Sequence, residues 1–128
     1  MTFYEKLNRI WDKSGSLVCV GLDPDLGKIP AHLTADDSEP HPAFAFNRAI
    51  IDATADLVCA YKPQIAHFSG QSLEKDLALT LDYLRERYPE IPVILDGKRG
   101  DVSGTAAFYA REAFDRYGAD ALTVNPYL

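Results

Sequence analysis

The sequence predicts an α/β fold, specifically the first half of a (β/α)8 TIM barrel with four parallel strands and crossover helices. Short apolar runs alternate with amphipathic segments along the chain, a pattern typical of a parallel sheet with helical connections. Polar residues close these runs at intervals of roughly 30 to 40 residues, the length of one strand-and-helix unit. A complete barrel needs about 250 residues, and this chain has 128. We therefore expect a single incomplete barrel domain over residues 1–128, truncated after the fourth strand.

Each expected strand is a short apolar run that a polar residue, proline or glycine ends. The four strands are expected at residues 17–22, 58–61, 92–95 and 121–124. Helical spacing of apolar residues predicts a short opening helix from Phe3 to Trp11 and further helices at 43–57, 72–88 and 104–117. The Pro-rich segment 24–42 and the stretch around Ser69 are expected to be loops.

Composition narrows the possible function classes. The net charge of −6, with no basic run, predicts no nucleic-acid partner. The sequence contains no run of about 18 consecutive apolar residues, so no membrane span is expected. The first residues lack the apolar core of a signal peptide, so a cytoplasmic protein is expected. Cys19 and Cys59 are expected to be buried apolar side chains, and His32 and His41 to be solvated in their loop.

The third strand runs directly into a group of charged residues. Asp96 and Lys98 are two positions apart, so they are expected to project to the same side, with Asp101 just beyond. Buried charges cost several kcal/mol before pairing offsets the cost, so this placement indicates function rather than stability. A surface loop with an ion pair is the alternative interpretation.

Polar residues end the other strands too: Asp23 the first, Lys62 the second and Asn125 the fourth. In a barrel these ends converge on one face, where opposite charges can hold one another ionised. Such an array suits proton transfer at carbon, decarboxylation or aldol chemistry. Two carboxylates could bind Mg²⁺, but Lys98 between them argues against a metal site.

The segment from Asp96 to Asp101, with Thr105 four residues later, resembles the D-x-K-x-x-D signature of the orotidine 5′-phosphate decarboxylase family. The other strand ends agree with the longer-chain bacterial subgroup: Gly21-Leu22-Asp23-Pro24, Tyr61-Lys62-Pro63 and Thr123-Val124-Asn125-Pro126-Tyr127. The resemblance runs from about residue 16 to residue 128. It implies decarboxylation of orotidine 5′-monophosphate to UMP in de novo pyrimidine biosynthesis, with no metal and no organic cofactor.

The resemblance also implies roles for individual residues. Lys98 is the acid that protonates the pyrimidine carbon, Asp96 lies against the substrate carboxylate, and Lys62 links the carboxylates and the ribose. Asp23 holds a ribose hydroxyl, and Asn125 lies near the pyrimidine. The family's phosphate-binding loop lies in the second half of its barrel, so substrate binding by residues 1–128 is expected to be incomplete.

Three further expectations follow from the resemblance. Asp101 and Thr105 are contributed to the neighbouring subunit's site in a homodimer with shared active sites. Gln64 is a substrate-binding residue at a position where many relatives carry Asn. Two other interpretations stay open, namely a Mg²⁺-dependent sugar-phosphate decarboxylase or aldolase of the same superfamily, and a catalytically silent half-barrel fragment.

Overall fold

Helices and strands alternate along the chain in the computed structural model, which describes residues 1–33 and 41–127. The α-helices are α1 (Phe3–Ser14), α2 (Pro42–Thr54), α3 (Ile65–Ser69), α4 (Glu74–Arg87) and α5 (Ser103–Ala110). The strands are β1 (Cys19–Leu22), β2 (Ala60–Pro63), β3 (Ile94–Arg99) and β4 (Ala121–Val124). Two 3₁₀ turns, η1 (Leu26–Lys28) and η2 (Ala31–Leu33), follow β1, and a π-helical turn, η3 (Arg111–Arg116), follows α5.

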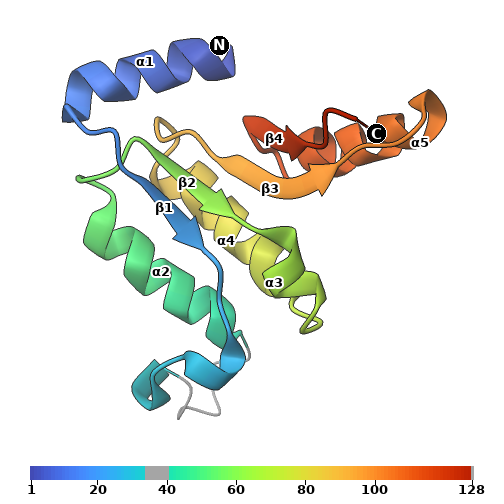
Figure 1. Cartoon of the computed structure of the whole chain (residues 1–128). Coiled ribbons are helices and arrows are strands. Elements are labelled where there is room, and N and C mark those ends of the chain that lie inside the picture. The colour runs from blue at the N-terminus through green and yellow to red at the C-terminus, as the bar shows by residue number, and fades with distance from the viewer. Residues whose placement is uncertain (34–40, 128) are drawn as a thin grey trace.

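The four strands are parallel and follow one another in space in their chain order (Figure 1). β1 pairs with β2 from Cys19↔Ala60 to Leu22↔Pro63, and β3 pairs with β4 from Ile94↔Ala121 onward. Two isolated bridges, Tyr61↔Val93 and Gln64↔Asp96, join β2 to β3. This arrangement, with helices connecting parallel strands, confirms the predicted α/β architecture and covers part of a barrel.

The core lies between the strands and the two long helices α2 and α4. Ile51 of α2, Leu77 of α4 and Tyr61 of β2 are fully buried there. The Tyr61 hydroxyl donates a 3.0 Å hydrogen bond to the Ile51 carbonyl, so even its polar atom is satisfied. No helix among the described residues is long and apolar enough to cross a membrane.

Helix α1 lies across the end of the sheet at which the strands begin (Figure 1). A capping box between Thr2 and Glu5 starts the helix, and Gly15 ends it in the left-handed conformation. Lys6 pairs with Asp120 at 2.8 Å, just before β4, which ties the helix to that end. The opposite end of the sheet is therefore the one at which the polar strand ends are accessible.

Some expected boundaries differ from the observed ones. β1, β2 and β3 begin two residues later than predicted. β2 and β3 also end later, because their pairing with neighbouring strands extends into the polar residues that end each apolar run. Residues Ile65–Ser69 form the short helix α3 where a loop was expected, since five residues are too few to show a periodicity. The predicted loop 24–42 contains the two 3₁₀ turns, and its residues 34–40 lie outside the described ranges.

Two expectations about single residues are wrong. Cys59 is buried as expected, but Cys19 is exposed because β1 pairs on one side only among the described strands. His41 is not freely solvated: its Nδ1 lies 3.2 Å from the Asp76 carboxylate. Asp76 is buried on α4 and also accepts a 3.0 Å hydrogen bond from the Phe44 N–H, so it caps α2 from a neighbouring helix.

Candidate active site

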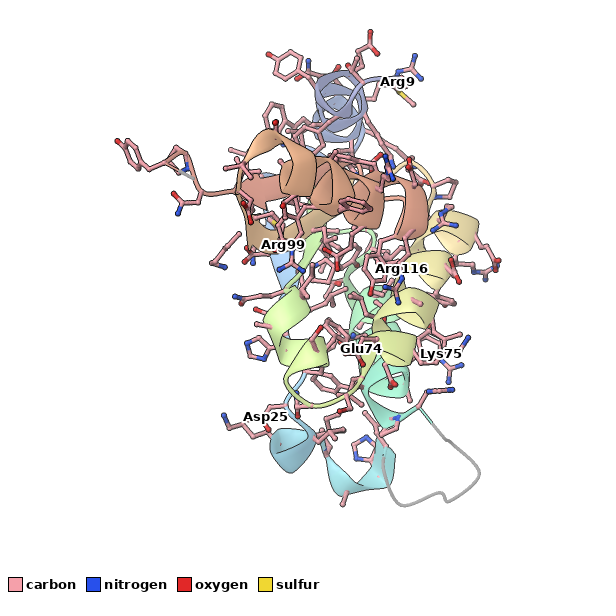
Figure 2. All side chains as sticks on the ribbon, turned by 90° about the vertical axis from the view of Figure 1, so that its right-hand side faces the viewer. Arg9, Asp25, Glu74, Lys75, Arg99 and Arg116 are labelled. Atoms are coloured by element: carbon pink, nitrogen blue, oxygen red, sulfur yellow. The ribbon has the colours of Figure 1, made fainter. Side chains whose placement is uncertain are left out.

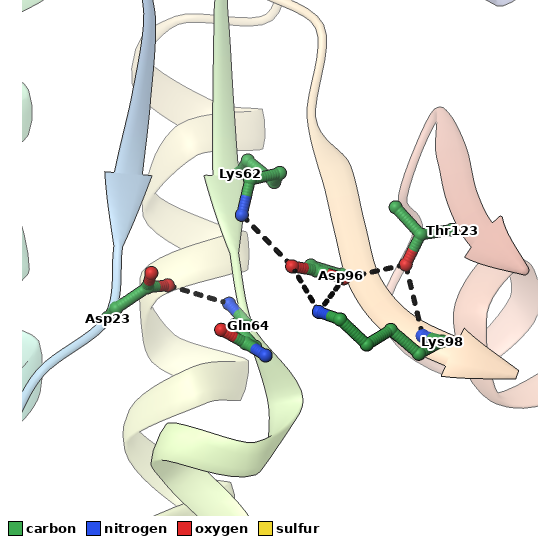
Figure 3. A network of polar contacts seen from close by, with 6 residues as sticks. All are labelled: Asp23, Lys62, Gln64, Asp96, Lys98 and Thr123. Atoms are coloured by element: carbon green, nitrogen blue, oxygen red, sulfur yellow. Dashed lines mark hydrogen bonds and ion pairs between the residues drawn. The ribbon is translucent and has the colours of Figure 1, made fainter.

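The carboxylate of Asp96 is the centre of a polar network at the carboxyl ends of β2, β3 and β4 (Figure 3). Its Oδ2 accepts a 3.0 Å hydrogen bond from Lys62 Nζ, and Lys98 Nζ lies 2.8 Å from both of its oxygens. Thr123 Oγ1 donates to Oδ1 at 2.7 Å. The expectation that Asp96 and Lys98 project together is therefore confirmed, and Lys62 joins them from the next strand.

An irregular pairing of β3 with β4 shapes this part of the site. Leu95 pairs with Leu122 and Arg99 with Val124, so Asp96, Gly97 and Lys98 stand opposite Thr123 alone. Lys98 has φ 47°, in the left-handed region that a residue with a side chain rarely adopts. Asp96 and Lys98 thus meet across a bulge, and not on a regular strand as the spacing suggested.

Glycine at position 97 fits the crowding in this bulge. A Cβ there would lie 3.0 Å from Leu122 Cδ1 and 3.2 Å from Ile65 Cδ1. Those contacts are tighter than ordinary van der Waals distances, so a side chain would push against β4 and α3 together.

Electrostatic pairing keeps Asp96 and Lys62 ionised. Burial on its own would raise the pKa of the Asp96 carboxyl, but hydrogen bonds from Lys98, Thr123 and Lys62 hold that pKa well below its usual range. Burial would lower the pKa of Lys62, yet its hydrogen bond with Asp96 and the charges of Asp96 and Asp23 raise it overall. Two ammonium groups therefore flank the Asp96 carboxylate, where they can also contact an anionic ligand.

Asp23 and Gln64 lie next to this network, at the ends of β1 and β2 (Figure 3). One Asp23 carboxylate oxygen accepts a 3.2 Å hydrogen bond from the Gln64 backbone N–H. Asp23 is exposed, and Gln64 is half-buried. The structure thus brings Asp23 to the same face as Lys62 and uses the backbone of Gln64, a group that does not depend on the residue type.

Asp101, Thr105 and Asn125 are exposed and make none of the contacts to Asp96. Asp101 has φ 136°, and its carboxylate accepts a 2.7 Å hydrogen bond from the Val102 N–H. Asn125 Oδ1 accepts a 3.0 Å hydrogen bond from the Tyr127 N–H. Asp101, Asn125 and Lys98 share the wall of a cavity of about 390 Å³, so they border one space.

Thr123 is the residue of this network that reasoning from the sequence missed. It lies two positions before Asn125, so strand periodicity predicts that both side chains point to the same side. The sequence therefore held a signal for it, although a single threonine in an apolar strand is usually a packing residue.

Metal binding has no support among the described residues. No group of three or more His, Cys, Asp or Glu side chains is arranged there to hold an ion. Both oxygens of Asp96 accept hydrogen bonds from ammonium groups, which occupy the positions that a cation would need. The arrangement can instead stabilise negative charge and deliver a proton from an ammonium group.

Comparison with known proteins places these residues in a family context. The model of the orotidine 5′-phosphate decarboxylase / HUMPS family matches residues 16–128. Orotidine 5′-phosphate decarboxylase of Cellvibrio japonicus is 59% identical over all 128 residues, and that of a Janthinobacterium species is 56% identical. The match covers the whole of this chain and 46% of each relative, so the chain spans about half of their length.

A solved structure agrees with the sequence comparison. The structure of Leishmania donovani OMP decarboxylase superimposes with a TM-score of 0.78 at 36% identity. The superposition covers 99% of this chain and 45% of that one. The fold described above is therefore shared along nearly the whole length of the chain.

Proposed function

Because the chain belongs to the orotidine 5′-phosphate decarboxylase / HUMPS family, we propose that its protein converts orotidine 5′-monophosphate to UMP in de novo pyrimidine biosynthesis. The observation that carries the proposal is the Asp96 carboxylate held between the ammonium groups of Lys62 and Lys98. We further propose that residues 1–128 are one incomplete barrel domain, to which further residues add the phosphate-binding part.

The chemistry assigned to Lys98 follows from the charge that the reaction creates. When the bond between the ring carbon and the carboxylate breaks, CO₂ leaves and the electron pair stays on the ring carbon. An ammonium group beside that carbon stabilises the developing negative charge and then donates its proton to form the C–H bond. Lys98 regains a proton from solvent, to which its side chain is 64% exposed.

The other site residues bind and orient the substrate in this proposal. Asp96 lies against the reacting carboxylate, and Lys62 holds Asp96 on one side and the ribose on the other. Asp23 accepts a hydrogen bond from a ribose hydroxyl, while Asn125 contacts the pyrimidine across the cavity it shares with Lys98. Gln64 supports Asp23 through its backbone N–H. No metal ion and no organic cofactor takes part.

The proposal includes a homodimer in which each subunit lends Asp101 and Thr105 to the site of the other. Two observations support this part. Both residues are exposed in the single chain, and the backbone of Asp101 is held in an unfavourable conformation at the rim of the cavity. Strain of this kind is typical of functional positions. A cytoplasmic location with no nucleic-acid partner completes the proposal, in keeping with the net charge of −6.

The proposal can be tested in a chimera in which this chain replaces the matched segment of the Cellvibrio japonicus relative. We expect the purified chimera to form UMP from orotidine 5′-monophosphate with a kcat within about tenfold of that relative, equal to about 1.4 kcal/mol of barrier. A chimera that folds like the relative and yet forms no UMP would show that the proposal is wrong. Activity that requires added Mg²⁺ would favour the sugar-phosphate alternative.

The shared site has a separate test in mixed dimers of two variant chimeras, Lys98→Ala and Asp101→Asn. Each pure dimer has two damaged sites, whereas a mixed dimer collects both changes in one site and leaves the other intact. Random equal mixing makes half of the dimers mixed, so activity should return to about a quarter of the parent value. Subunits with two different tags verify the exchange. If exchange occurs and activity does not return, Asp101 acts within its own subunit.

A further inference from the structure

Thr123 stands alone opposite the bulge of β3. Regular pairing of β3 with β4 stops after Leu95↔Leu122 and resumes at Arg99↔Val124, so one residue of β4 faces three of β3. A bulge of this kind leaves backbone groups of the longer segment without their usual partners across the ladder. Any structure that holds Lys98 in place must therefore supply a replacement partner for its backbone.

The Thr123 hydroxyl supplies that partner. The Lys98 N–H donates a 3.0 Å hydrogen bond to Thr123 Oγ1, at a point where Lys98 has no paired residue on β4 (Figure 3). The backbone of Lys98 is left-handed at this point, a conformation that is unfavourable for a residue with a Cβ. A fixed acceptor on the neighbouring strand offsets part of this cost.

The same hydroxyl also holds the Asp96 side chain. A hydroxyl has a single proton, and here it is directed at Asp96 Oδ1, 2.7 Å away, because an ionised carboxylate can only accept. The oxygen lone pairs remain for the Lys98 N–H. One atom thus fixes the carboxylate of Asp96 and the backbone from which the Lys98 ammonium extends.

Threonine suits this role better than serine. Its β-branched side chain strongly restricts rotation about χ1, so the hydroxyl keeps its direction without further contacts. Thr123 is also half-buried, which limits competition from water for its two hydrogen bonds.

We propose that Thr123 is a positioning residue for this site, whose hydroxyl locks the bulge of β3 and thereby sets where the Lys98 ammonium lies relative to Asp96. The proposal rests on the proposed decarboxylation for its effect on turnover. A second part of the proposal is that Thr123 protects the Lys98 N–H from hydrogen exchange. This part can be tested whether or not the protein is catalytically active.

Two variants of the chimera separate the hydroxyl from the rest of the side chain. Thr123→Val keeps the shape and removes the hydroxyl, while Thr123→Ser keeps the hydroxyl. We expect Thr123→Val to lower kcat at least tenfold with a change in KM below about threefold, and Thr123→Ser to keep kcat within threefold. If valine prevents folding, Thr123→Ala removes the same hydroxyl from a smaller side chain.

Amide hydrogen exchange of Lys98, followed by NMR, is the second measurement. Exchange should be at least tenfold faster in Thr123→Val and within about threefold of the parent in Thr123→Ser. Thr80→Val is the matched control, because it removes a buried hydroxyl that bonds Asn47 and the Asp76 carbonyl on α4. That variant should lose stability without changing the exchange of Lys98 or the kcat.

The outcomes separate the two proposals. A chimera with no turnover before any substitution contradicts the proposed decarboxylation, and Lys98 exchange then decides alone whether Thr123 holds the bulge. Unchanged exchange in Thr123→Val overturns the positioning role. In an active chimera, the positioning role is also overturned if Thr123→Val exchanges Lys98 faster but keeps kcat within twofold of the parent. It is overturned as well if Thr80→Val shows the faster Lys98 exchange and lower kcat expected of Thr123→Val.

Discussion

Substitution of Lys98 by alanine in the chimera gives the sharpest test of the site. The substitution removes the proton donor, and a general acid typically accelerates a reaction by about 10²–10⁴-fold. It also removes a charge placed to stabilise the carbanion, worth about 10²–10³ by analogy with oxyanion donors. Taking the lower figure for each effect, we expect kcat to fall at least about 10⁴-fold, equal to about 5.5 kcal/mol of barrier.

The structure also predicts what Lys98→Ala should leave intact. The Lys98 side chain is 64% exposed, so its ion pair with Asp96 adds less than about 1 kcal/mol to the free energy of unfolding. Asp96 keeps its hydrogen bonds from Lys62 and Thr123, so affinity for UMP should fall much less than turnover. Stopped-flow detection of UMP formation, calorimetric binding of UMP and urea unfolding measure these three quantities.

Two further variants make the result specific. Lys75→Ala removes an exposed lysine at the start of α4, well apart from Arg99 at the end of β3 (Figure 2), and should change no measured quantity. Lys98→Arg keeps the charge but not the proton transfer, because a guanidinium group does not give up its proton near neutral pH, and its kcat should lie between those of the alanine variant and the parent. If Lys98→Ala keeps turnover within about tenfold of the parent, the assignment of Lys98 as the acid is refuted.

Three other predictions concern the scaffold of the site, each measured in the chimera. Asp76→Ala should lower the free energy of unfolding in urea by about 2 to 3 kcal/mol, because the N-terminus of α2 loses its buried cap. Asp82→Ala, on the exposed side of α4, should change the free energy of unfolding by less than about 0.5 kcal/mol. Equal losses would contradict the capping role of Asp76. Gly97→Ala should destabilise by about 1 to 3 kcal/mol and lower kcat, because the new Cβ crowds β4, while Gly104→Ala, with nothing within 4 Å of its Cβ, should not destabilise; a fully active and stable Gly97→Ala variant would contradict the crowding. A hydrogen bond to the Asp52 carboxylate raises the pKa of Tyr83 from 10.0 to about 12, so the native state retains a proton that the unfolded state loses first, and stability should fall as pH rises from about 10 to 12. Tyr83→Phe should make this fall shallower, and ultraviolet titration of tyrosine would contradict the expectation if Tyr83 ionised near pH 10.

The sequence predicted the outline of the site because the ends of parallel strands converge by geometry alone. Lys62 and Asp96 lie on strands that residue spacing and apolar runs identified, and they meet at 3.0 Å in the structure. The resemblance to a family added roles for them but no coordinates. Asp101 and Thr105 remain predictions, because their proposed partners belong to a second subunit.

What the sequence did not predict depends on contacts between distant residues or on local distortion. The bulge at Lys98 arises from pairing with β4, which no local periodicity shows. The pairing of His41 with Asp76 joins two helices across 35 residues of sequence, so a histidine in a Pro-rich segment gave no indication of it. Cys19 was expected to be buried because its run is apolar, but burial on β1 depends on what lies beside that strand.

The ion pair between Lys62 and Asp96 joins β2 to β3, the two neighbouring strands with the fewest paired residues between them. β1 pairs with β2 without interruption and β3 pairs with β4 on both sides of the bulge, while β2 and β3 are joined by two isolated bridges. The residues proposed for catalysis therefore also fasten the two halves of the sheet to each other. Catalytic groups often reduce the stability of an enzyme, so replacing them by mutation can raise the free energy of unfolding. Here, a descendant that lost Asp96 would lose part of this join as well, so selection for a stable fold and selection for activity would preserve the same residue.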